Sequence, residues 1–240
     1  MKNIQRILSY MRRAVEDYSM IEDGDRIAVG VSGGKDSLVT LIGLAHLRRF
    51  YPNKFDLEAI TIDMGFEGAD FSPIAKLCQE LGVNYTVVKT NIKEVVFDIR
   101  KESNPCSLCA KMRKGALNEK AMELGCEKIA LGHHNEDVIE TFFLSLFYEG
   151  RLNCFSPVTY LDRKEVTLIR PLIYTPEKMV KSFVKANEIP VVKNPCPADG
   201  NTKRERMKEF VKLAHNEDKN FKERVFGAIN RGLDGWKREQ

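Results

Sequence analysis

The 240-residue chain lacks the long apolar runs that insert into membranes. No stretch reaches the roughly 20 apolar residues that a transmembrane helix needs. Residues 1–6 carry charge without the apolar core of a signal peptide behind them. These absences predict a cytoplasmic protein with no membrane partner. In that compartment the six cysteines are not expected to form disulfides, so they are core residues, metal ligands or reactive thiols.

The chain also has little excess charge. Its net charge is +4, and residues 201–240 hold eleven Lys and Arg against seven Asp and Glu, which accounts for all of it. A basic segment suits a polyanionic partner such as RNA. A solvated helix face explains the same charges equally well, so charge alone does not decide between the two.

One stretch near the N-terminus organises the rest of the chain. An apolar run with β-branched residues at 27–31 predicts a strand buried on both faces. The glycines that follow interrupt this strand, and a helix begins directly after them. Backbone N–H groups at such a helix start, together with a lysine, suit a phosphate. An acid follows the lysine where a Walker A loop has Ser or Thr, so that motif is excluded. We expect a phosphate-binding loop made of Ser32, Gly33, Gly34, Lys35, Asp36 and Ser37.

Strands and helices alternate along the chain. This alternation predicts an open, mostly parallel, Rossmann-like α/β sheet with flanking helices and a small helical C-terminal region. We expect an N-terminal helix within 1–25, a nucleotide-binding domain at 26–195 and a basic helical segment at 196–240 packed on the same domain. The expected strands cover 27–31, 57–62, 85–89, 128–131, 155–160 and 166–170, and the expected helices cover 3–18, 72–81, 95–99, 108–124, 138–148, 177–186, 202–215 and 218–229. A further long helix follows the phosphate loop, and Thr175 is the expected N-cap of the helix at 177–186.

Ligands of such sheets bind beyond the carboxyl ends of the strands. Asp63 and Met64 follow the second strand, and the run from Gly132 to Asp137 follows the fourth, so both lie beside the phosphate loop. We therefore expect Asp63, Met64, Gly132 and Asp137 to bind ATP together with that loop. We expect Asp36 or Asp137 to help hold Mg²⁺, which binds one or two carboxylates together with phosphates and water. An acid in the first turn of a helix is also favoured as a cap. The roles of the two histidines, 133 and 134, stay open between packing and catalysis.

The cysteines fall into two groups. Cys106 and Cys109 form a single C-x-x-C pair at a helix start, and Cys196 lies between two prolines. A thioredoxin-type dithiol would directly follow a strand, and a structural zinc site would need four ligands. Three thiolates on an iron–sulfur cluster would leave one iron open for sulfide or substrate. The other three cysteines, Cys78, Cys126 and Cys154, lie in apolar settings and are interpreted as packing residues.

Five motifs carry a resemblance to a known family. They are Ser-Gly-Gly-Lys-Asp-Ser at 32–37, Pro-Cys-Ser-Leu-Cys-Ala-Lys-Met-Arg-Lys-Gly at 105–115, Ala-Leu-Gly-His-His-Asn-Glu-Asp at 130–137, Ile-Arg-Pro-Leu-Ile-Tyr at 169–174 and Pro-Cys at 195–196. In this order, across residues 20 to 215, the chain resembles the tRNA 2-thiocytidine synthetases (TtcA family) of the PP-loop ATP pyrophosphatase superfamily. The zinc-ribbon cysteine pairs of other tRNA thiolases are absent.

The resemblance implies an ATP-dependent tRNA sulfurtransferase. It implies that ATP and Mg²⁺ activate the 2-oxygen of the anticodon-loop cytidine 32, and that sulfur replaces it. Many members have a second cysteine where this chain has Asp199, but a [4Fe-4S] cluster held by three cysteines needs only Cys196 there. The implied partners are tRNA, a cysteine desulfurase or sulfide as sulfur donor, and a second copy of the chain in a homodimer. By this resemblance, the expected catalytic residues are Lys35, Asp36, Asp137, Cys106 and Cys196. The expected cluster ligands are Cys106, Cys109 and Cys196. The residues expected to bind tRNA are Lys203, Arg204, Arg206 and Lys208.

Two alternatives share some of these features. A lysidine-type ligase or an amidotransferase uses the same phosphate loop but needs no cysteines, and a 2-thiouridine synthetase differs in its target base. A non-catalytic zinc-binding or RNA-binding module would bind one zinc and no ATP. Replacement of Cys106 separates the ligase from a thiolase, and a metal analysis separates the module from it.

Overall fold

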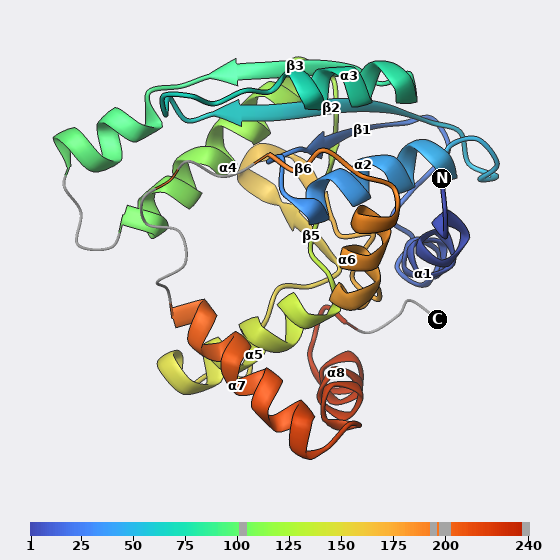
Figure 1. Cartoon of the computed structure of the whole chain (residues 1–240), viewed down its shortest axis with the longest axis vertical. Helices are drawn as coiled ribbons and strands as arrows, with labels where there is room; N and C mark the ends of the chain where they lie inside the picture. Colours follow the sequence, from blue (N-terminus) through green and yellow to red (C-terminus); the bar gives the residue numbers. More distant parts are fainter. Residues whose placement is uncertain (101–104, 193–195, 197–202, 237–240) are drawn as a thin grey trace.

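The computed structural model describes residues 1–100, 105–192, 196 and 203–236, and a sheet with the strand order β3-β2-β1-β4-β6-β5 runs through its centre (Figure 1). Neighbouring strands are parallel except β5 and β6, which form an antiparallel hairpin. This arrangement confirms the predicted open, mostly parallel sheet. The strands are β1 (Asp25–Gly30), β2 (Phe55–Asp63), β3 (Asn84–Lys89), β4 (Lys128–Ala130), β5 (Val158–Leu161) and β6 (Val166–Ile169).

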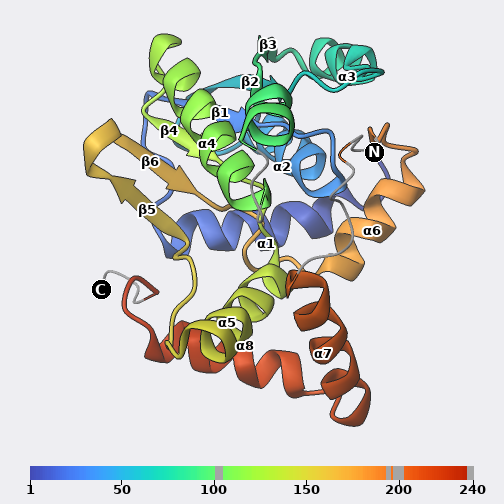
Figure 2. The ribbon, with the colours of Figure 1, turned by 90° about the vertical axis from the view of Figure 1, so that its left-hand side faces the viewer.

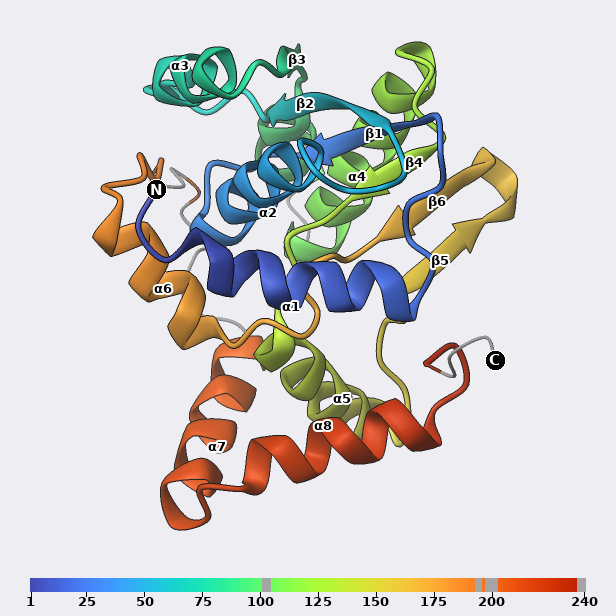
Figure 3. The same ribbon diagram turned by 90° about the vertical axis from the view of Figure 1, so that its right-hand side faces the viewer.

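Helices cover both faces of the sheet and one end of the molecule. Helices α1, α2 and α6 lie on one face (Figure 3), and α4 lies on the other (Figure 2). None of the described helices combines the length and apolar character needed to span a bilayer. The helices are α1 (Ile4–Asp17), α2 (Lys35–Leu47), α3 (Ser72–Leu81), α4 (Pro105–Glu123), α5 (Asn135–Glu149), α6 (Glu177–Ala186), α7 (Lys203–Glu217) and α8 (Phe221–Gly232), with a π-helix at Glu94–Ile99 and a 3₁₀ turn at Asp162–Lys164.

The alternation of side chains in β1 divides the core into two layers. Ile27 and Val29 point into the layer under α1, α2 and α6, whereas Ala28 between them points into the layer under α4. Helix α2 is apolar on almost every side because it lies between the sheet, α1 and α6. The central strand and the helix that follows it are therefore the most buried elements, and they hold the loop between them in place.

Several helix and strand starts differ from the prediction by two or three residues. Helix α4 begins at Pro105, so the C-x-x-C pair lies inside its first turns, and α5 begins at Asn135. The first hairpin strand begins at Val158 rather than at residue 155. Thr175 is not the N-cap of α6. Its buried hydroxyl has no hydrogen-bond partner among the residues that the structure describes, and the Glu136 carboxylate accepts the N–H of Glu177 instead, at 2.7 Å. A side chain from another helix thus takes the role predicted for a local residue.

The C-terminal helices pack on α5 rather than on the sheet. Figure 1 shows α5, α7 and α8 together at one end of the molecule. Phe143 of α5 stacks on Phe221 of α8 at 5.8 Å between ring centroids, and Phe210 of α7 contacts Phe143 edge-on. The buried Trp236 then contacts Tyr18, which follows α1. The predicted division at residues 25 and 195 stays a prediction, but these rings join the C-terminal segment to the rest of the fold.

Gly132 is where the loop after β4 meets the start of α2. A Cβ atom on Gly132 would lie 2.7 Å from both the carbonyl carbon of Asp36 and the amide nitrogen of Ser37. Real Cβ atoms do not approach backbone this closely, and backbone cannot move aside as a flexible side chain can. Glycine is therefore required here for the approach of two backbone segments.

We expect Gly132→Ala to lower the free energy of unfolding by about 1–3 kcal/mol, the usual effect of overpacking a rigid contact. Urea denaturation followed by circular dichroism measures this change. Gly115→Ala in α4 is the matched control, because a Cβ there meets nothing within 4 Å and alanine favours a helix. Wild-type stability in Gly132→Ala would contradict the close approach.

Candidate active site

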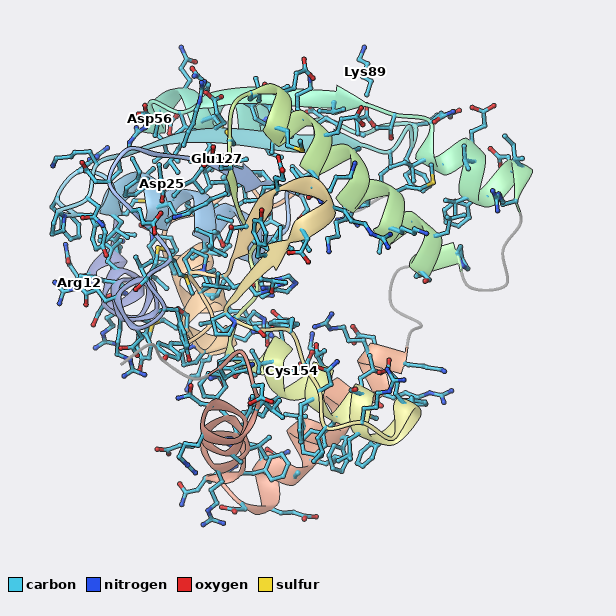
Figure 4. The ribbon with its side chains drawn as sticks, turned by 180° about the vertical axis from the view of Figure 1, so that it is seen from behind. Arg12, Asp25, Asp56, Lys89, Glu127 and Cys154 are labelled. Atoms are coloured by element: carbon cyan, nitrogen blue, oxygen red, sulfur yellow. The ribbon has the colours of Figure 1, made fainter. Side chains whose placement is uncertain are left out.

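The carboxyl ends of β1, β2 and β4 open into a cavity of about 660 Å³. Figure 4 labels Asp25, Asp56 and Glu127 at the amino ends of these three strands, with Lys89 at the carboxyl end of β3 on the opposite side. Parallel strands bring their carboxyl ends to one edge, which is why residues distant in sequence meet here. Of the residues predicted to bind ATP, the cavity is lined by Ser32, Gly34, Asp36, Ser37, Asp63, Met64 and Gly132.

The phosphate loop is held by its own hydroxyl groups and by a backbone hydrogen bond from Val192. The Ser32 N–H donates to the Ser37 hydroxyl at 3.1 Å, and that hydroxyl donates to the Gly34 carbonyl at 2.9 Å. Gly33 does not line the cavity. It has a φ of 81°, its carbonyl accepts the N–H of Val192 at 3.0 Å, and a Cβ would lie 2.9 Å from the Val192 Cβ. Gly33 therefore shapes the loop rather than the cavity wall.

Lys35 also lies beside the cavity rather than on its wall. Its Nζ is 2.7 Å from Asp36 Oδ2 and 3.2 Å from Glu177 Oε1. Burial by itself lowers the pKa of Lys35, but these two carboxylates outweigh burial and raise it. Lys35 therefore stays protonated, and two carboxylates hold its charge next to the loop.

Glu177 is a site residue that sequence reasoning missed. It lies at the start of α6, far from the loop along the chain, and it reaches Lys35 only because α6 packs against α2. Burial would raise the pKa of its carboxyl, but a hydrogen bond from Lys181 and the charge of Lys35 lower it to about 2. Glu177 is therefore a permanent negative charge beside the phosphate loop.

One carboxylate oxygen of Asp36 has no hydrogen-bond partner in the described part of the chain. The Oδ2 atom accepts from Lys35, whereas the Oδ1 atom is buried, with His134 Nε2 at 3.7 Å. A buried, unpaired carboxylate oxygen on the cavity wall is a suitable ligand for a hard cation. The magnesium role of Asp36 stays a prediction that this orphaned oxygen supports.

Asp137 caps α5, as an acid in a first turn often does. Its Oδ2 accepts the His134 N–H at 2.9 Å, and His134 Nδ1 accepts the Asp137 N–H at 3.4 Å, which forms a capping box. Its Oδ1 lies 3.3 Å from Arg204, and the side chain does not line the cavity. The structure thus assigns capping to His134 and Asp137, and the predicted magnesium and nucleotide contacts of Asp137 stay untested.

His133 differs from its neighbour because it lines the cavity. Its ring packs on Phe155 at 4.7 Å between centroids. Burial, reinforced by the charge of Arg170, lowers the pKa of His133 to about 4. Its Nδ1 is buried and has no hydrogen-bond partner among the described residues. His133 therefore presents a neutral imidazole to whatever fills the cavity.

The three predicted cluster ligands lie near one another. Cys106 is exposed and Cys109 buried in the first turns of α4, and Cys196 is half-buried. Burial raises the pKa of the Cys109 thiol, and Cys196 and Cys106 raise it further, while Arg113 acts in the opposite direction. Among the described residues, however, no three His, Cys, Asp or Glu side chains are already arranged to hold a metal ion. The ligand role of the three cysteines stays a prediction.

A sulfur contact joins these cysteines to the cavity. The Cys109 thiol donates to the Met64 sulfur at 3.6 Å, and Met64 lines the cavity beside Asp63. The surroundings of Cys109 are otherwise apolar, with Ile92 and Val96 in the same cluster. The three remaining cysteines are buried, and burial raises the pKa of Cys78, Cys126 and Cys154 to about 11, which confirms them as packing residues.

Cations line the opposite wall of the cavity. Arg113 and Lys114 of α4 and Arg204 of α7 contribute to the lining. The sequence analysis did not predict Arg113 and Lys114 as site residues. Both stand in the Lys-Met-Arg-Lys run one to two helical turns after the C-x-x-C pair, and this position was a usable signal. Their charges suit a polyphosphate or an RNA backbone.

Three of the four residues predicted to contact tRNA have partners within the chain. Arg204 donates to the Thr141 hydroxyl at 3.2 Å and lies 3.6 Å from Glu140. Burial and the charge of Asp137 raise the pKa of Glu140 to about 7. Lys208 Nζ lies 4.0 Å from Glu177. Lys203 Nζ lies over the ring of Tyr148, and Arg206 is exposed. Arg204 and Lys203 thus hold α7 on α5, and the RNA contacts of all four residues stay predictions.

Comparison with known proteins places this site in a family. The PP-loop domain family matches residues 4–214. The chain is 40% identical to the tRNA-cytidine(32) 2-sulfurtransferase of Geobacter metallireducens over 231 residues, which are 95% of this chain and 90% of the relative. It is also 40% identical to the protein of the same name from Geotalea daltonii over 228 residues, 94% of this chain and 90% of the relative.

A solved structure agrees with this match. The U34-tRNA thiolase NcsA from Methanococcus maripaludis, with its [4Fe-4S] cluster, superposes with a TM-score of 0.77 at 25% identity, over 97% of this chain and 80% of that one. The NH3-dependent NAD synthetase of Campylobacter jejuni shares the fold alone, with a TM-score of 0.52 at 15% identity. The chain therefore belongs to the PP-loop domain family and, within it, to the tRNA-cytidine(32) 2-sulfurtransferases.

Proposed function

We propose that this protein is an ATP-dependent tRNA sulfurtransferase that replaces the 2-oxygen of cytidine 32 with sulfur. The observation that carries the proposal is the continuity of the site. One cavity is bounded by the phosphate loop and by Met64, whose sulfur accepts the Cys109 thiol. Activation of an oxygen and delivery of sulfur therefore have adjacent sites. Relatives about 40% identical over most of the chain are named tRNA-cytidine(32) 2-sulfurtransferases.

ATP is expected to place its phosphates on the backbone N–H groups at the start of α2. Lys35 already stands there as a protonated ammonium held by Asp36 and Glu177. A bound phosphate competes with these carboxylates for Lys35, while Arg113 and Lys114 face it from across the cavity. These donors stabilise negative charge as it grows on the departing pyrophosphate.

The donor set beside the loop fits Mg²⁺. Mg²⁺ keeps several waters and binds one or two carboxylates together with substrate phosphates, and the unpaired Oδ1 of Asp36 is available for this. When bound, the ion neutralises phosphate charge and orients the α-phosphate for attack. Asp137 uses both of its oxygens within the protein, on His134 and Arg204. Asp36 is thus the better supported ligand of the two.

The reaction needs two substitutions. The cytosine 2-oxygen attacks the α-phosphorus of ATP, a new P–O bond forms, and the bond to the β-phosphate breaks to release pyrophosphate. Sulfide then attacks C2, and the C2–O bond breaks with release of AMP, so that oxygen leaves as part of the phosphate. His133, held neutral by burial, lines the cavity as a hydrogen-bonding group that adds no charge near the base.

The three thiols fit a [4Fe-4S] cluster by their chemistry. Cys106, Cys109 and Cys196 come from two segments that meet closely enough for each neighbour to alter the pKa of Cys109. With three thiolate ligands, such a cluster supplies one iron that no protein atom occupies. Ligation is expected to draw the thiols closer together and to release the Cys109 proton, which Arg113 favours.

The RNA must expose its base to reach this cavity. Extrusion of a base costs a few kcal/mol in a duplex and less in a loop, which suits an anticodon-loop cytidine. Lys203, Arg204, Arg206 and Lys208 are the proposed backbone contacts. The sulfur donor, a cysteine desulfurase or free sulfide, and the homodimer remain part of the proposal without a structural counterpart.

The alternatives have less support. The 2-thiouridine reading rests on a structural relative at 25% identity, whereas relatives named for cytidine 32 reach 40%. A lysidine-type ligase gives no reason for three neighbouring thiols beside the cavity. A module without catalysis gives no reason for an orphaned carboxylate oxygen on a phosphate loop.

Removal of a cluster ligand is expected to abolish iron binding. Protein purified without oxygen should contain about four irons and four sulfides per chain, and Cys106→Ala and Cys196→Ala should lose both. Iron, acid-labile sulfide and the electron paramagnetic resonance spectrum measure this. Cys126→Ala is the matched control, because Cys126 is buried in the core layer under α4. One zinc per chain would favour the module, and no iron at all would favour the ligase. Full iron in the Cys106 variant would remove Cys106 as a cluster ligand.

Loss of the Asp36 charge is expected to impair activation more than binding of RNA. Asp36→Asn should slow tRNA-dependent pyrophosphate release about 100-fold or more and raise the Mg²⁺ concentration needed for half-maximal rate. Asp56→Asn is the control, since Asp56 is exposed at the other end of the sheet (Figure 4). An unchanged Mg²⁺ requirement in Asp36→Asn would remove Asp36 as a ligand.

A further inference from the structure

Aromatic side chains stand in solvent at the C-terminal end of α5. Phe147 is 53% exposed and Tyr148 42% exposed, and Leu213 of the adjacent α7 is 64% exposed. Phe147 packs one part of its ring on Phe210, at 5.4 Å between centroids. Its other part remains uncovered. Several large apolar groups gathered on two packed helices mark an interaction surface more often than isolated ones do.

Cations are interleaved with these rings. Lys203 Nζ lies 4.6 Å from the centroid of the Tyr148 ring. In α7 the residues Lys203, Arg206 and Phe210 recur at a spacing of three and four, so they share one side of the helix. One oxygen of the neighbouring acid is held within α5, because the Glu149 carboxylate accepts from the Ser145 hydroxyl at 3.0 Å. The surface thus combines π-faces with positive charge.

This surface lies next to the cavity. Arg204, the neighbour of Lys203 in the first turn of α7, lines the cavity wall. The start of α7 and the C-terminal end of α5 also lie on the same side of the molecule as the start of α4, as Figures 1 and 2 show. An RNA loop with one base in the cavity therefore has its neighbouring nucleotides within reach of Tyr148.

We propose that the aromatic–cation surface, formed by Phe147, Tyr148, Lys203, Arg206 and Leu213, binds unpaired nucleotides of the tRNA loop. A base stacks on Tyr148, and Lys203 and Arg206 neutralise the adjoining phosphates. The inference rests on the proposed function and adds the site that holds the substrate. A second copy of the chain fits this surface less well, because it would have to bury two cations against apolar groups.

The test compares two RNAs and two aromatic positions. One RNA is the anticodon stem-loop of the substrate tRNA, and the other is its stem alone as a blunt duplex. Fluorescence anisotropy measures the affinity of each for Tyr148→Leu, Tyr148→Phe and Lys203→Gln. Tyr160→Leu is the matched control, since Tyr160 is 58% exposed on β5, away from α5 and α7. Gel filtration of every variant reports the oligomeric state.

Tyr148→Leu should bind the stem-loop about tenfold more weakly, the loss expected for one stacked base, and should bind the duplex as the wild type does. Tyr148→Phe should retain wild-type affinity. Lys203→Gln should reduce the slope of log affinity against log salt concentration by about 1, the amount expected for the loss of one phosphate contact. Equal affinity of Tyr148→Leu and the wild type for the stem-loop would overturn the proposed role of the surface. If Tyr148→Leu changed a dimer into a monomer but kept its RNA affinity, the surface would be a dimer interface instead. A wild-type protein that binds neither RNA would overturn the proposed function together with this surface.

Discussion

The carboxylate of Glu177 is the contact on which the arrangement of the site depends. The Glu177 carboxylate lies 3.2 Å from Lys35 of the phosphate loop, and the backbone N–H of Glu177 donates to the Glu136 carboxylate of α5. Lys181 on α6 and Lys208 on α7 approach the same carboxylate. Because Lys181 and Lys35 keep Glu177 ionised in a partly buried place, this one residue joins the loop to α5, α6 and α7. A phosphate that takes Lys35 from Glu177 removes one of the cations that hold this charge.

Two kinds of chemistry meet in one cavity because its walls differ. The wall formed by the phosphate loop carries backbone donors and the spare oxygen of Asp36. Near Met64 the wall turns apolar and leads to the buried Cys109 sulfur. The third wall carries the cations of α4 and α7. In the proposed function, activation by ATP, sulfur transfer and RNA binding use separate surfaces that share one space.

Local patterns predicted the fold and the principal loop well. The apolar run before Ser32 and the glycines after it specify strand, turn and helix start through interactions between near neighbours in sequence. The Thr175 cap was wrong because Glu136 from another helix holds the N–H of Glu177. The prediction could not see this competitor, nor could it see that Asp137 would be occupied by His134 and Arg204.

The sequence by itself determined the alternating fold, the phosphate loop, the burial of three cysteines and the family. Each of these depends on short-range order or on a linear motif. Only the tertiary structure decided that Glu177 faces Lys35, that Met64 touches Cys109 and that Lys203 lies over Tyr148. These contacts join residues far apart in the chain. Their distances depend on how whole helices pack on the sheet, and no local pattern of residues encodes that geometry.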